Sequence, residues 1–95
     1  MLDQLTSRDF ADLPAGALVV EHAGAKLPME VLQLRELPPI SPRAKPFAVV
    51  LAGPASPMLQ QGIHTLVHPA LGRLDLFMVP IGRDAERTRY EIIFN

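Results

Sequence analysis

Proline and glycine are the residues that most restrict what this chain can fold into. Ten of its 95 residues are proline and six are glycine, and the proline share is roughly twice the average of about 5%. Proline lacks a backbone N–H and clashes with the preceding helical turn, so it breaks helices. Residues 38–46 alone hold four prolines. These interruptions exclude long helices and leave short segments.

Six of the short segments carry the apolar, β-branched patterns that are typical of strands. We expect strands at residues 17–22, 26–37, 47–52, 63–68, 73–79 and 89–94. The chain is too short for two ordinary domains, so residues 1–95 are predicted to form a single all-β domain. A small antiparallel barrel and a compact two-sheet sandwich both limit exposed strand edges, and the barrel is the favoured prediction.

The second predicted strand changes its hydrophobic parity half-way along. Leu27, Met29 and Val31 alternate on one face, whereas Leu32 and Leu34 fall on the other. An extra residue in one strand, a β-bulge, produces such a switch and bends the strand. A short helix over residues 29–36 is the alternative interpretation.

The start of the chain predicts one short helical turn. Thr6 and Asp9 have the spacing of a capping box, in which the two ends of the first turn bond to each other. Pro14 stops a longer helix, so we expect a turn at about residues 7–11. Three apolar side chains would hold it against one end of the core: Leu5, Phe10 and Leu13.

Composition and charge exclude several classes of protein. Without cysteine there is no disulfide, thiolate zinc site or cysteine nucleophile. A net charge of −1, a single tyrosine and no tryptophan argue against nucleic-acid binding. The longest apolar run, residues 47–52, is far below the roughly 20 residues that cross a membrane, and the first ten residues do not resemble a signal peptide. We expect a cytoplasmic protein with neither nucleic-acid nor membrane partners.

The sequence holds no motif that carries catalysis. None of the serines lies in a Gly-x-Ser-x-Gly elbow, and the glycines stand singly rather than in a phosphate-binding loop. Glu30, Glu36 and Asp75 could form an acid–base pair only through tertiary contacts. The expectation is therefore a non-enzymatic protein without a cofactor.

The three histidines are the candidate ligands for a metal or a small molecule. His64 and His68 have a spacing that chelates a metal on a helix, but on a strand it separates the two rings by about 13 Å. His22 could supply a third imidazole, although nothing in the sequence places it nearby. Structural roles are the alternative, and His68, directly before Pro69, is expected to hydrogen-bond the following turn.

The last two predicted strands contain more apolar residues than one inner face needs. If the inner face holds the alternating residues that include Met78 and Ile92, then Phe77, Val79 and Ile93 form an outward apolar strip. A protein partner or a second copy of the chain would cover this strip. Alternatively, the N-terminal turn and the proline-rich segment fold over it.

Residues 80–88, between those two strands, are predicted to be a polar loop. Arg83, Arg87 and Arg89 alternate there with Asp84 and Glu86. Alternating charges of this kind are typical of a solvated surface.

Several phrases of the sequence together resemble a known family. They are Gly-Pro at 53–54, Gln-Gly at 61–62, His-Pro-Ala-Leu-Gly at 68–72, Leu-Phe-Met-Val-Pro-Ile-Gly at 76–82 and Tyr-Glu-Ile-Ile-Phe-Asn at 90–95. The chain is similar to an uncharacterised family of small bacterial all-β domains, a domain of unknown function. The resemblance implies genomic neighbours that resemble phage-tail collar proteins, and an aromatic residue at the position of His64, which favours a packing role there.

Taken together, these observations predict a non-enzymatic interaction or structural module. Its partner would be another protein or a second copy of the chain in a homo-oligomer, and the resemblance adds a phage-tail-like assembly as the setting. The alternative is a β-barrel that binds a small ligand or a metal.

Overall fold

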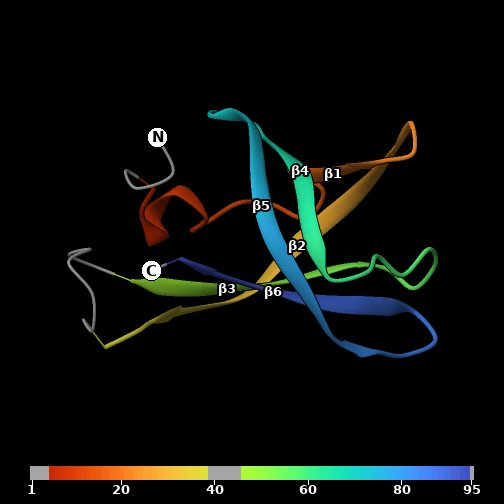
Figure 1. Cartoon of the computed structure of the whole chain (residues 1–95). Coiled ribbons are helices and arrows are strands. Elements are labelled where there is room, and N and C mark those ends of the chain that lie inside the picture. The colour runs from red at the N-terminus through yellow and green to blue at the C-terminus, as the bar shows by residue number, and fades with distance from the viewer. Residues whose placement is uncertain (1–4, 39–45, 95) are drawn as a thin grey trace.

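The computed structural model describes residues 5–38 and 46–94, and these form a closed antiparallel barrel (Figure 1). Its strands are β1 (Leu18–His22), β2 (Ala25–Glu36), β3 (Phe47–Pro54), β4 (Gly62–His68), β5 (Gly72–Arg83) and β6 (Arg87–Phe94). Around the barrel the order is β1-β2-β3-β6-β5-β4. The predicted all-β class and the barrel are thus confirmed.

The barrel is built from two similar three-stranded meanders, β1-β2-β3 and β4-β5-β6. The antiparallel pairs β1–β4 and β3–β6 join them. Each meander has a central strand of 12 residues that passes from one neighbour to the other, and each central strand contains a register shift. In β2 the shift lies between Val31 and Gln33, which confirms the predicted bulge and rules out the short helix.

The prediction of a polar loop over residues 80–88 is wrong. Strand β5 continues to Arg83 and β6 begins at Arg87, so only three residues separate them. The second register shift, between Pro80 and Gly82, lets β5 carry a proline within its length, since bulges are among the few places where a sheet tolerates one. The charged residues of this region are mostly exposed side chains of strands.

The turn between β5 and β6 is held by the carboxylate of Asp84. Its Oδ1 accepts the backbone N–H groups of Glu86 at 2.8 Å and Arg87 at 2.9 Å. The bond from Arg87, followed by that from Glu86, lowers the pKa of Asp84 below its usual value. A lowered pKa means that this group stabilises the fold while ionised and loses that contribution as the pH falls through it.

Strand β3 is buried on both faces, as its continuous apolar run predicts. The inner residues, such as Val49 and Leu51, belong to the main core. Its outer face carries Ala48, Val50 and Ala52, which are also buried. These outer positions are small enough for side chains of the flanking strands to close over them.

Two ion pairs connect β2 to β6 across this outer face of β3. Arg35 Nη2 lies 2.8 Å from Glu91 Oε2, and Arg87 Nη1 bonds to Glu30 Oε1. Because β3 lies between β2 and β6, each pair bridges over it. All four side chains remain partly exposed, so the pairs contribute modestly to stability, about 0–1 kcal/mol each.

The N-terminal turn closes one end of the barrel. It is a single 3-10 turn at Ser7–Asp9, shorter than predicted, and the N–H of Thr6 donates to Asp9 Oδ2 at 2.8 Å. Phe10 follows it and is fully buried, with its ring centroid 6.1 Å from that of Phe47 and 5.4 Å from that of Phe94. The turn therefore lies where β3 begins and β6 ends (Figure 1).

Candidate functional site

His68 is a structural residue that ties the N-terminal turn to the β4–β5 hairpin. Its Nδ1 accepts the backbone N–H groups of Ala70 at 3.0 Å and Leu71 at 3.2 Å. The proton must then be on Nε2, which donates to the backbone oxygen of Asp9. The side chain is only 5% exposed and its ring meets Phe10 edge-on. The predicted turn contact of His68 is therefore confirmed, and both of its ring nitrogens are engaged.

His22 and His64 come together at the opposite end of β4 from His68. They lie on the neighbouring strands β1 and β4, one residue beyond the paired residues Glu21 and Thr65. Their ring centroids are 6.5 Å apart. Among the described residues no group of three or more histidine, cysteine, aspartate or glutamate side chains is placed to hold a metal ion. The structure thus unites two of the three candidate histidines and separates the third.

The pocket beside this pair is lined by the end of β1 and the segment that leads into β4. Its lining residues are His22, Met58, Leu59, Gln60, Gln61, Gly62, Ile63 and His64. His64 is oriented by a contact of 2.7 Å between its Nε2 and the backbone oxygen of Gln60. The backbone N–H of Leu59 donates to the hydroxyl of Tyr90 at 2.9 Å, which anchors this segment to the core.

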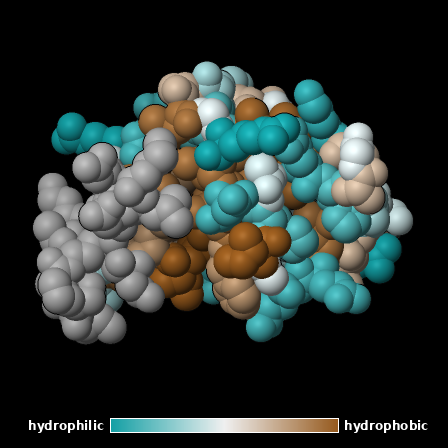
Figure 2. Space-filling model, turned by 45° about the horizontal axis from the view of Figure 1, so that its top comes forward, coloured by the Kyte–Doolittle hydropathy of each residue, from teal (hydrophilic) through white to brown (hydrophobic). Residues whose placement is uncertain are grey.

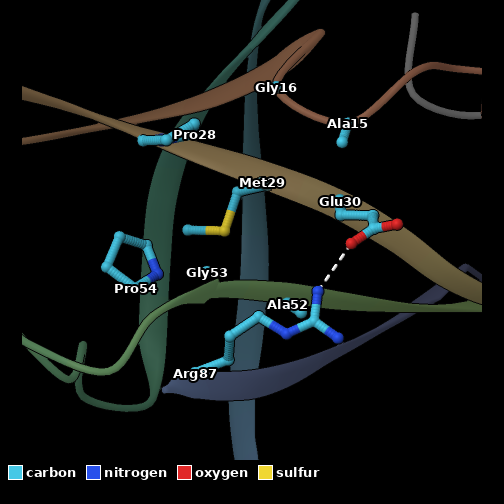
Figure 3. Close-up of a pocket in the computed structure, with 9 residues that line it drawn as sticks. All are labelled: Ala15, Gly16, Pro28, Met29, Glu30, Ala52, Gly53, Pro54 and Arg87. Atoms are coloured by element: carbon cyan, nitrogen blue, oxygen red, sulfur yellow. Dashed lines mark hydrogen bonds and ion pairs between the residues drawn. The ribbon is translucent and has the colours of Figure 1, made fainter.

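A second, shallow hollow lies where β2 and β3 meet the approach to β1. Apart from Gly53-Pro54 at a strand end, no pattern in the sequence indicated this hollow. Figure 3 shows its lining: Ala15, Gly16, Pro28, Met29, Glu30, Ala52, Gly53, Pro54 and Arg87. Its surface is apolar, and its two charged groups are the carboxylate and guanidinium that pair with each other.

The floor of this hollow depends on the absence of a side chain at residue 53. A Cβ atom placed on Gly53 would lie 2.6 Å from Met29 Sδ, so the thioether occupies the space that a side chain would need. In Figure 3 the side chain of Met29 extends over Gly53. Glycine at residue 53 therefore leaves room for the Met29 side chain in the lining of the hollow.

Two of the three residues of the predicted outward strip are exposed. Phe77 is 49% exposed and Ile93 is 53% exposed, while Val79 is half-buried. Sequence reasoning missed Ile63, which is 65% exposed and is the direct cross-strand partner of Phe77. Its outward position on β4 was visible from parity, but its pairing with Phe77 depends on the strand register. We call Ile63, Phe77, Val79 and Ile93 the apolar strip.

The N-terminal turn does not cover the apolar strip, because it lies at the barrel end against Phe47 and Phe94. The other predicted cover, the proline-rich segment, falls largely on residues 39–45, outside the described residues. Figure 2 shows hydrophobic side chains in separate patches between hydrophilic ones on one face of the molecule.

A family model for a domain of unknown function, DUF6916, matches residues 5–94. The chain belongs to the DUF6916 family. Membership confirms the resemblance to an uncharacterised domain family. No curated protein and no solved structure matches this DUF6916 chain. In the part of the chain that the structure describes, no helix is long and apolar enough to cross a membrane.

Proposed function

We propose that this DUF6916 domain is a non-enzymatic interaction module that binds a second copy of itself, or another protein, through the apolar strip. The observation that carries the proposal is the exposed cross-strand pair of Ile63 and Phe77, together with the exposed Ile93 on β6. Exposed large apolar side chains that gather on one surface are typical of protein interfaces.

The energetics support the apolar strip as the centre of an interface. Full burial of a phenylalanine or isoleucine side chain contributes about 1.5–3 kcal/mol, and an interface would gain roughly half of this from each of Ile63, Phe77 and Ile93, which are already partly buried. A stable interface buries about 800 Å² on each partner, so surrounding polar residues have to form a rim. The Arg35–Glu91 ion pair is available for that role, since Glu91 is the cross-strand partner of Val79.

The ion pairs on the barrel surface also support a role in protein binding rather than catalysis. Glu21, Glu30 and Glu91 each pair with an arginine on a neighbouring part of the surface. An enzyme needs acids and bases that converge on a cavity. Here those carboxylates are placed to hold strands together.

The setting of the interaction follows from the sequence resemblance. On this basis we propose that the protein is bacterial and that its partner belongs to a phage-tail-like assembly. Cytoplasmic location and the absence of nucleic-acid and membrane partners are part of the same proposal, on the grounds of charge and composition.

Replacement of Phe77 by aspartate is expected to abolish self-association. The carboxylate would have to be desolvated in the contact, which costs far more than the lost apolar area contributes. Analytical ultracentrifugation across a concentration series should show a dimer or larger species for the wild type and a monomer for Phe77→Asp.

Leu32→Asp is the matched control for this experiment. Leu32 is an exposed apolar residue at the β2 bulge, outside the apolar strip, and its substitution should leave the association unchanged. A wild type that is monomeric at all concentrations contradicts self-association, and the partner would then be another protein. An oligomer that Phe77→Asp leaves intact contradicts the strip as its interface.

A further inference from the structure

We infer that the pocket between His22, His64 and Met58 is a copper-binding site. The inference does not rest on the proposed interaction, although Ile63 of the apolar strip also lines this pocket. It rests on three soft or borderline donors that line one pocket and come from different parts of the fold.

The two imidazoles lie at the mouth of the barrel, on the inward-facing side of their strands. Val20 and Leu66, two residues before His22 and two after His64, are fully buried in the core. Side chains two residues apart on a strand share a face, so both histidines extend the core toward solvent. Both are half-buried, which leaves them accessible to an ion while the barrel holds their backbones in place.

The separation of the rings suits a shared metal ion. Metal–nitrogen bonds of about 2.0–2.1 Å place two imidazole centroids about 5 to 6.5 Å apart, from a tetrahedral to a linear angle. The observed 6.5 Å lies at the upper end of that range, which corresponds to a near-linear arrangement of two nitrogen ligands. Two-coordinate and three-coordinate geometries with wide angles are those that Cu⁺ accepts.

His64 already has the orienting contact that metal-binding histidines use. Its Nε2 lies 2.7 Å from the backbone oxygen of Gln60, so that nitrogen carries the proton and donates. The lone pair of Nδ1 is then the one available to an ion. A ligating histidine usually donates its other ring N–H to a carbonyl or carboxylate, which fixes the ring and raises its basicity.

Met58 decides the chemical class of the ion. It lines the same pocket as the two imidazoles, and copper binding by all three requires its thioether to turn toward them. The lining holds no carboxylate, which Ca²⁺ and Mg²⁺ require. Thioether ligands favour Cu⁺, and imidazole ligands bind Cu²⁺ more tightly than the other divalent ions of the first row. Copper is the metal that fits both donor types.

The test is copper binding by the full chain without a polyhistidine tag. Under anaerobic reducing conditions, competition with a chromogenic Cu⁺ chelator should show one ion bound per chain. His22→Ala and His64→Ala should each weaken binding by about tenfold or more, as loss of a ligand or its support does. Met58→Leu should weaken Cu⁺ binding while Cu²⁺ affinity changes little, because the thioether is the soft donor.

His68 serves as an internal control, since both of its ring nitrogens are bonded within the protein. On titration with Ag⁺, a diamagnetic substitute for Cu⁺, NMR signals of the His22 and His64 rings and of the Met58 methyl should shift, and those of His68 should not. Circular dichroism confirms that each variant is folded. Absence of measurable Cu⁺ binding, or binding that both histidine variants retain, overturns the inference. Shifts centred on other residues overturn it as well.

Discussion

Phe10→Ala is expected to lower the free energy of unfolding by about 3–5 kcal/mol, as large-to-small substitutions of buried aromatic residues do. Phe10 has no exposed surface, and its ring contacts Phe47, Phe94 and His68 at the end of the barrel. The substitution removes the aromatic ring that closes the end of the barrel and leaves a cavity between the N-terminal turn and β3. Equilibrium unfolding in urea, followed by tyrosine fluorescence and circular dichroism, measures the change.

Phe77→Ala, measured at a protein concentration at which the chain is monomeric, is the matched control, because it makes the same chemical change on the barrel surface. Phe77 is half exposed, so its loss should cost less than about 1 kcal/mol. Phe10→Leu, which keeps most of the apolar volume, should give an intermediate loss and covers the case in which Phe10→Ala does not fold. Equal losses for Phe10→Leu and Phe77→Ala would show that the turn does not close the core.

His68→Ala is expected to cost about 2–4 kcal/mol, because a buried polar group that loses its partner costs about 1–3 kcal/mol. The substitution leaves the backbone oxygen of Asp9 without its donor and the N–H groups of Ala70 and Leu71 without their acceptor. Thermal and urea unfolding give the size of the loss. His64→Ala, at the half-buried mouth of the barrel, should change stability by less than about 1 kcal/mol.

Two measurements separate the hydrogen bonds of His68 from its packing. His68→Phe keeps a ring beside Phe10 but has no hydrogen-bonding nitrogen, so it should still be destabilised by about 1–3 kcal/mol. Nitrogen chemical shifts of the wild-type imidazole should report the tautomer with the proton on Nε2. A stable His68→Phe variant, or the opposite tautomer, would contradict the role of His68 as a hydrogen-bonded tie.

The architecture of the barrel was largely predictable because its signals are local. Prolines and glycines delimit the strands, and the change of parity after Val31 marks the bulge that the structure contains. The spacing of Thr6 and Asp9 predicts the N-terminal turn. Each of these signals acts through the chain's own neighbours, so no tertiary contact is needed to detect it.

The failure at residues 80–88 has a physical reason. Charge was interpreted as a sign of a loop, whereas Arg83, Arg87 and Arg89 belong to strands and remain partly or fully exposed. Pro80 also lies within β5, beside a register shift that adapts the strand to it. Polar side chains indicate that one face of a strand is exposed to solvent. They do not distinguish a strand backbone from a loop.

Some residues of the candidate sites could be predicted from the sequence, whereas others depend on how the strands pair. The outward positions of Phe77 and Ile93 follow from alternation within one strand, and so they were predicted from the sequence. The addition of Ile63 to the apolar strip depends on the register between β4 and β5. The hollow at Met29 also depends on strand pairing, because the side chain of Met29 on β2 lies over Gly53 of the neighbouring strand β3.

By itself the sequence determined the class of fold, the approximate position of each strand and the alternation of its side chains, because backbone sterics and a period of two act over a few residues. Only the tertiary structure decided which strands are neighbours. That choice placed His22 beside His64 and joined Ile63 to Phe77. Closure of the barrel sets these pairings, and closure is a property of all six strands together.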